Sequence, residues 1–179
     1  MDITVNSTTL SLTRGDITTE KVEVIVNAAN EGLRGGGGVD GAIHTAGGPS
    51  IMDECRRIGR CPTGTAVLTG GGNLSASYVI HTVGPIYSGG TRSEEELLQG
   101  AYHSSLTLAK EKGLKSVAFP SISTGVYGYP IKDASVIALK TTIDFIKENP
   151  NAFTLVSFCL FSDRDLAVYT ESLRELTGS

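Results

Sequence analysis

Hydrophobic positions along this chain alternate between two spacings, one typical of strands and the other typical of helices. Short apolar or β-branched runs predict strands at residues 22–27, 65–69, 78–83, 116–119 and 154–161. The run at 22–27 is apolar at nearly every position, which indicates a strand buried on both faces, as in the centre of a parallel sheet. Residues 3–6 and 9–14 mix β-branched with polar side chains, and this mixture predicts two more strands, at least one of them near a sheet edge.

Between the strands, apolar residues recur every three or four positions, which is the helical spacing. Helices are predicted at residues 39–47 and 49–58, from the Ser93–Glu96 capping box to about Lys112, and at residues 133–148 and 162–177. This alternation predicts a single α/β domain over residues 1–179, an α/β/α sandwich with helices on both faces of a largely parallel sheet. We expect the two opening strands to extend that sheet antiparallel at one edge.

Two loops carry unusual chemistry, and each follows a predicted buried strand. Residues 27–40 follow the strand at 22–27, and residues 120–130 follow the strand at 116–119. Ligands of open parallel sheets bind beyond the carboxyl ends of the strands. The two loops should therefore lie on the same rim and form one cleft.

The first loop contains four consecutive glycines, Gly35, Gly36, Gly37 and Gly38, just before a predicted helix start. Glycine lets backbone N–H groups crowd around a ligand, and a helix N-terminus adds free N–H groups, so the segment suits a phosphate. The alternative is that these glycines form only a mobile turn and bind no ligand. The loop has neither the Gly-Lys-Ser/Thr of a Walker A motif nor dinucleotide-binding spacing.

The second loop offers hydroxyls, glycines and tyrosines. Its backbone N–H groups could wrap a second phosphate, with Ser123 or Thr124 as additional donors, or the segment could be a simple surface turn. Ser123 as a nucleophile is set aside because no G-x-S-x-G motif or histidine triad accompanies it.

Several polar residues have two possible roles each. Asp40 is either a carboxylate favoured by a helix dipole or the group that orients or deprotonates a water. Asp16 is either a helix N-cap or the acceptor for a ligand amine. Asn27 and Asn30 either stabilise a turn or contact ribose hydroxyls. His44 is one helical turn from Asp40 and could pair with it, or it could simply be packed.

Composition narrows the function classes. The chain has 179 residues, a net charge of −4 and three cysteines. The negative charge argues against nucleic acid as the main partner, but it allows a small anion held by uncharged N–H groups. The cysteines show no CxxC spacing and the histidines no metal-ligand spacing, so we expect no metal and a reducing, cytoplasmic setting. No signal segment or membrane-spanning run is evident, and we expect a monomer.

Six motifs in order resemble those of macro domains of the MacroD type: GDIT from Gly15, VIVNAAN from Val24, GGGGVDGAIH from Gly35, CPTG from Cys61, HTVGP from His81 and FPSISTGVYGYP from Phe119. The resemblance implies a three-layer α/β/α fold with a mixed sheet and an ADP-ribose cleft. It implies that Asp16, with Ile17 beside it, meets the adenine, and that Phe161 packs against that ring. The diphosphate would be clamped by Gly37, Gly38 and Val39 and by Ser123, Thr124, Gly125, Val126 and Tyr127. Asn30 and Asp40 would meet the distal ribose and carry the chemistry, with Asn27 nearby.

Members that resemble this chain remove mono-ADP-ribose from acidic side chains and deacetylate O-acetyl-ADP-ribose, without a cofactor. The implied partners are therefore ADP-ribose, O-acetyl-ADP-ribose and mono-ADP-ribosylated proteins. Either Asp40 or the ligand diphosphate would activate the water. Two alternatives remain open: a reader that binds ADP-ribose without cleaving it, and an interaction or RNA-related module that uses the fold as a scaffold.

Overall fold

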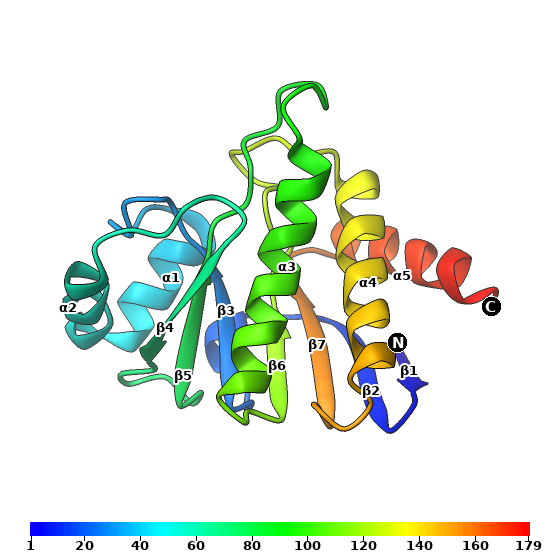
Figure 1. Cartoon of the computed structure of the whole chain (residues 1–179), viewed down its shortest axis with the longest axis horizontal. Coiled ribbons are helices and arrows are strands. Elements are labelled where there is room, and N and C mark those ends of the chain that lie inside the picture. Colours follow the sequence, from blue (N-terminus) through cyan, green and yellow to red (C-terminus); the bar gives the residue numbers. More distant parts are fainter.

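A computed structural model describes all 179 residues, and it is built around one seven-stranded sheet (Figure 1). The order of strands across the sheet is β1-β2-β7-β6-β3-β5-β4. Their bounds are β1 Asp2–Val5, β2 Thr8–Arg14, β3 Val24–Ala28, β4 Ala66–Gly70, β5 Tyr78–Thr82, β6 Ser116–Phe119 and β7 Leu155–Leu160. β3, the strand predicted to be buried on both faces, lies between β6 and β5 and is parallel to both.

The sheet is mixed, as expected, but the antiparallel pairs differ in part from the sequence prediction. β1 forms the edge and is antiparallel to β2, yet β2 itself is parallel to β7. The prediction that both opening strands add antiparallel was therefore wrong for β2. The second antiparallel pair is β4 with β5, at the opposite edge.

Helices cover both faces of the sheet. One face carries α3 (Glu94–Glu111), α4 (Ile131–Glu148) and α5 (Asp163–Thr177); the other carries the 3-10 turn η1 (Ile17–Thr19), α1 (Gly38–Gly47) and α2 (Pro49–Ile58). Each face has its own hydrophobic cluster. Val24 and Val26 of β3 belong to one cluster and Ile25 to the other, which explains why this strand is apolar at successive positions.

The predicted capping box at the start of α3 is wrong. Ser93 has a left-handed φ of 59° and its side chain caps nothing. Glu94 is buried instead, and its carboxylate accepts backbone N–H groups of Ser88 and Gly90 at 2.8 Å each and that of Arg92. Burial acts to raise the pKa of Glu94, but these N–H groups outweigh it and hold the pKa below its usual value. Glu94 thus fixes the loop before its own helix.

The helix predicted at residues 162–177 is confirmed as α5, and Ser162 caps it by accepting the N–H of Asp165 at 3.1 Å. α4 begins at Ile131, two residues before the predicted start. No helix is both long and apolar enough to cross a membrane. In Figure 1 the chain segments that follow β5 and β6 rise above the sheet, next to the N-terminal end of α3.

A candidate ADP-ribose site

The loops after β3 and β6 are neighbours because those two strands are paired in parallel. In the first loop, the backbone N–H groups of residues 36–39 make no hydrogen bond within the protein; in the second, those of residues 124–127 make none. The first run lies at the N-terminus of α1, where the helix dipole favours negative charge. Two runs of unpaired donors on one rim can hold an anion between them.

The glycines of the first loop keep it open to a ligand. Gly37 is the N-cap of α1, and a Cβ added there would meet no atom within 4 Å. Gly38 has a φ of 56°, which side chains rarely tolerate. The backbone at these positions is therefore reachable from solvent, as the phosphate interpretation requires.

The second loop is held from below by two buried tyrosines. The N–H of Ile122 donates to the hydroxyl of Tyr102 at 2.9 Å, and the hydroxyl of Tyr169 lies 2.7 Å from Ser121 Oγ. Thr124 donates its hydroxyl to Ser121, so its side chain is used inside the loop. The buried Oγ of Ser123 has no partner, which leaves it as the loop's one unused hydroxyl donor in the interior.

Asp40 lies in the first turn of α1 with its side chain almost buried. Its Oδ1 accepts a hydrogen bond from Asn27 Nδ2 at 2.9 Å and lies 3.3 Å from His44 Nε2. Its Oδ2 accepts nothing from the protein and points toward Gly36, where an added Cβ would be 3.6 Å away. One oxygen is thus held in place, and the other is left for a water or a ligand.

A chain of hydrogen bonds leads from Asp40 into the sheet. Asn27 Nδ2 also lies 3.1 Å from Nδ1 of His81, which is its register partner on β5. An amide nitrogen only donates, so Nδ1 of His81 accepts and the ring hydrogen is on Nε2. That Nε2 lies 2.9 Å from Thr69 Oγ1, whose hydroxyl donates to the carbonyl of Gly70 at 3.0 Å.

This chain of bonds keeps His81 neutral. Burial, followed by the nearby His44, lowers the pKa of His81 from 6.5 to about 4. A second proton on the ring would sit on Nδ1, where that N–H would face the N–H donor of Asn27 and could not bond to it. His81 is therefore a buried, neutral histidine whose ring accepts a hydrogen bond from Asn27 and holds that amide in place.

The position of Asn27 corrects one expectation. Its side chain is fully buried beneath Asp40, so direct contact with a ligand is not supported by the structure. The reason is that Asn27 belongs to β3 rather than to the loop after it. Its amide positions the Asp40 carboxylate instead.

One group of metal-ligand atoms comes together beside Asp40, although sequence spacing did not suggest it. Atoms of His44, Cys55 and His81 lie within 4.8 Å of one another. The His81 nitrogen that faces Cys55 carries the ring hydrogen, so its lone pair is not free unless the bond from Asn27 is broken. Burial, followed by the Asp40 and Glu54 charges, raises the pKa of the Cys55 thiol to about 11, away from the thiolate that binds metals.

Asn30 stabilises the turn that carries the glycines. Its Nδ2 donates to the carbonyl of Gly35 at 2.8 Å and its Oδ1 accepts the N–H of Arg34 at 3.0 Å. The turn interpretation of this residue is thus confirmed. One N–H and one lone pair of the amide remain unused, and these are the groups a ribose hydroxyl would need.

The residues assigned to the adenine lie at the far end of the rim. Asp16 caps η1 through Oδ1, which accepts the N–H of Thr18 at 3.0 Å, and its Oδ2 stays free. Ile17 is buried in the core, so only its backbone could face a ligand. Phe161 directly follows β7 and is 91% exposed. The N–H of Gly15 donates to Leu160 at 3.0 Å, which places Asp16 and Phe161 on adjacent strand ends.

The structure is thus an α/β/α protein with two runs of unpaired N–H groups on one rim of its sheet. Comparison with known proteins is consistent with that class: a Macro domain profile matches residues 26–138. The chain belongs to the macro domain family, and within it to the MacroD type.

Relatives and solved structures of similar sequence support this assignment. A macro domain-containing protein of Caldanaerobacter subterraneus is 53% identical over 93% of this chain and 97% of its own length. Human ADP-ribose glycohydrolase MACROD2 is 50% identical over 93% of this chain, which spans only 39% of that protein. The Oceanobacillus iheyensis macrodomain with ADP has a TM-score of 0.95 and 48% identity, covering 99% of this chain and 96% of its own. The Trypanosoma brucei macrodomain in complex with ADP-ribose has a TM-score of 0.87 and 41% identity, covering 92% and 68%.

Proposed function

We propose that this chain binds ADP-ribose and hydrolyses esters on its distal ribose, acting on O-acetyl-ADP-ribose and on proteins mono-ADP-ribosylated at Asp or Glu. The observation that carries the proposal is the Asp40 carboxylate, held through Oδ1 and open at Oδ2, beside unpaired N–H groups of the glycine loop. The names of MACROD2 and of the two ligand-bound macrodomains support the ligand class.

ADP-ribose fits the rim from end to end. Asp16 and Phe161 receive the adenine, residues 36–39 and 124–127 clamp the diphosphate, and Asn30 meets the distal ribose. Because the N–H donors carry no formal charge, the cleft accepts a dianion although the chain as a whole has a net charge of −4.

The reaction follows from Asp40 Oδ2. A water held there attacks the ester carbonyl, forms a C–O bond and gives its proton to Asp40 or to the ligand diphosphate. The bond from the carbonyl carbon to the ribose oxygen then breaks, and that oxygen takes the proton. The products are the free carboxylic acid and the ribose hydroxyl. N–H groups of the glycine loop offset charge in the transition state, and no metal takes part.

The test is release of ADP-ribose from a glutamate-modified protein by the wild type, Asp40→Ala and Asp40→Asn, with and without a chelator. Loss of a general base costs about 10²- to 10⁴-fold, so Asp40→Ala should bind ADP-ribose but lose turnover, and a chelator should change nothing. Asp40→Asn keeps an oxygen for Asn27 but cannot take a proton. Equal loss in both variants makes Asp40 the base, whereas activity retained only by Asp40→Asn assigns the proton to the diphosphate.

Asp133→Ala is the matched control, because Asp133 also lies in the first turn of a helix and is exposed. It should leave turnover intact. If Asp40→Ala also leaves turnover intact, Asp40 is only a helix-start carboxylate and the hydrolase proposal fails. ADP-ribose binding without release by the wild type would identify a reader.

We also infer that residues 1–179 form one domain, because a single sheet joins both hydrophobic clusters. A monomeric, cytoplasmic protein without nucleic acid or membrane partners agrees with the charge and the cysteine content.

A further inference from the structure

The strand order gives the ligand a direction along the rim. The adenine residues follow β2 and β7, the diphosphate loops follow β6 and β3, and the ribose residues follow β3. The next parallel strand is β5. Whatever is attached to the distal ribose must therefore leave the cleft toward the chain that follows β5.

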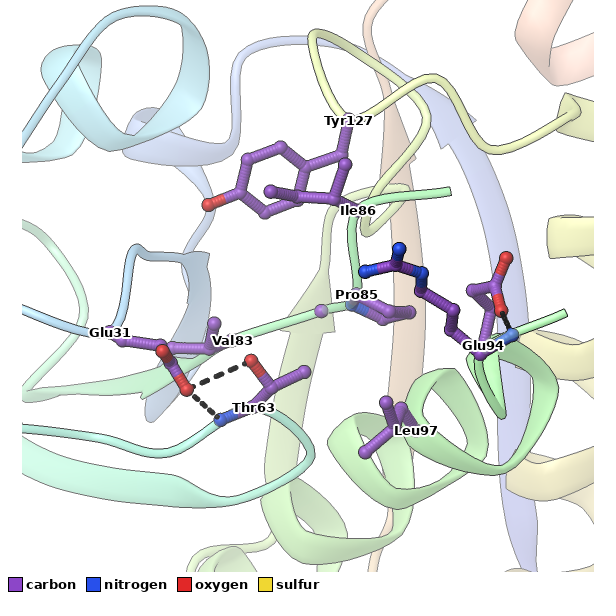
Figure 2. A pocket seen from close by; sticks show the side chains of 10 residues that line it. Glu31, Thr63, Val83, Pro85, Ile86, Glu94, Leu97 and Tyr127 are labelled. Atoms are coloured by element: carbon purple, nitrogen blue, oxygen red, sulfur yellow. Dashed lines mark hydrogen bonds between the residues drawn. The ribbon is translucent and has the colours of Figure 1, made fainter. Parts of the chain in front are cut away.

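A cavity of about 330 Å³ lies at that place (Figure 2). Its walls are Glu31, residues 83–86, Arg92 and Tyr127. Glu31 is the neighbour of Asn30 in sequence, and Tyr127 ends the second diphosphate loop. The N–H of Tyr87 donates to the carbonyl of Tyr127 at 2.9 Å, which ties the segment after β5 to that loop. The cavity is thus continuous with the proposed ribose end of the cleft.

Three charged side chains line the cavity, Glu31, Arg92 and Glu94, and they differ in whether they have partners within the protein. Glu31 Oε2 accepts the N–H and the hydroxyl of Thr63, at 2.9 and 3.1 Å, and the Glu94 carboxylate accepts three backbone N–H groups. Both carboxylates are therefore engaged within the protein. The exposed Arg92 side chain makes neither an ion pair nor a hydrogen bond, so it is the one charged side chain of the cavity without a partner in the protein. Ile86, 64% exposed, adds an apolar surface that Figure 2 shows next to Tyr127.

We propose that this cavity is the acceptor subsite: it binds the polypeptide that carries the ADP-ribosylated side chain and prefers carboxylates close to the modified residue. Arg92 supplies a charge-assisted contact to those carboxylates, and Ile86 packs against the peptide. The proposal rests on the proposed function, since it needs ADP-ribose in the cleft. Glu94 gives the subsite its shape, because it holds the loop that presents Arg92.

The test compares O-acetyl-ADP-ribose, which lacks a polypeptide, with two synthetic decapeptides ADP-ribosylated on a single glutamate, one flanked by aspartates and one by alanines. Arg92→Glu should raise KM for the aspartate-flanked peptide about 3- to 10-fold, as expected for reversing one charge at the rim of an interface, and change the alanine-flanked peptide less. Turnover of O-acetyl-ADP-ribose should stay within twofold. Arg57→Glu, an exposed and unpaired arginine on α2, is the matched control and should change none of these values. Equal effects of Arg92→Glu on all substrates, or no effect, would overturn the subsite.

A binding measurement separates this proposal from the hydrolase proposal. In an Asp40→Ala background, the aspartate-flanked peptide should bind several-fold more tightly than free ADP-ribose, and adding Arg92→Glu should remove that difference. Equal affinities would overturn the subsite even if hydrolysis is observed. If neither substrate is cleaved by the wild type but the difference in affinity is present, the hydrolase proposal fails and the subsite stands.

Discussion

Acidification should destabilise this protein through His81 in particular. The folded ring has a pKa of about 4 against 6.5 for an unperturbed histidine, because it is buried and because His44 lies nearby. Between those pH values the unfolded chain binds a proton that the folded chain does not. The free energy of unfolding should therefore fall as the pH drops from 6.5 toward 4 and level off below 4.

The magnitude follows from the two pKa values. At about 1.4 kcal/mol for each pH unit between them, His81 alone contributes about 3 kcal/mol of pH-dependent stability. That stability is fully present above pH 6.5. The titratable groups next to the ring are His44 from α1 and Cys55 from α2, which lies on the Nε2 side; Asp40 is reached only through Asn27, whose amide faces Nδ1.

The assay is urea unfolding at half-unit steps from pH 7.5 to 4, on the wild type and on His81→Asn. The asparagine oxygen can replace Nδ1 as an acceptor for Asn27, but the variant has no ring to titrate. Carboxylates contribute equally to both proteins, so the difference between the two curves isolates His81. Parallel curves between pH 6.5 and 4, or an imidazole NMR signal of His81 that titrates near 6.5, would refute the argument.

Two further substitutions test the surroundings of Asp40. Gly41→Ala should lower the free energy of unfolding by about 1–3 kcal/mol, although alanine normally favours a helix, because the new Cβ would lie 2.4 Å from the carbonyl oxygen of Gly36. Gly37→Ala is the control in the same denaturation experiment, because its new Cβ would meet no atom within 4 Å. Asn27→Asp should lower the free energy of unfolding by about 2–4 kcal/mol and also lower the rate of hydrolysis, because it replaces the amide that donates to Asp40 with a second buried acceptor. Stability of Asn27→Asp equal to that of the exposed Asn73→Asp would contradict this view of the hydrogen-bond chain.

The local pattern of apolar residues was sufficient to predict the helices and strands and the sheet edge at which the two loops meet. The apolar run at 22–27 identifies a central strand because a strand buried on both faces needs apolar residues at successive positions. Once β3 and β6 are central and parallel, the loops after them must share an edge. For this reason the sequence alone predicts that the glycine loop and residues 120–130 lie together.

Strand direction was harder, because non-local pairing decides it. β2 is parallel to β7, which lies about 140 residues further along the chain, and no local feature of β2 marks that partner. The direction of β4 did leave a signal. Only residues 71–77 connect it to β5, too short a segment for the crossover that a parallel pair requires.

The sequence also could not predict the roles of side chains that depend on contacts with neighbouring strands. Asn27 was predicted at the boundary of the strand 22–27 and the loop 27–40, and only its register with His81 on β5 places its amide against a ring rather than in solvent. The capping box at Ser93 and Glu96 failed for a related reason. The buried partner of the loop is Glu94, and only the folded path of residues 88–92 brings three N–H groups to its carboxylate.

The two oxygens of Asp40 explain how the first turn of α1 holds this carboxylate in one orientation. Oδ1 lies between a donor from the sheet, Asn27, and a ring from its own helix, His44, so a rotation of the side chain would weaken both contacts. Because both contacts use the same oxygen, Oδ2 is left toward Gly36 and the unpaired N–H groups. The same strand that supplies Asn27 also ends in the glycine loop. A shift of β3 would therefore move the carboxylate and the unpaired N–H groups together, so the proposed reaction would keep its geometry.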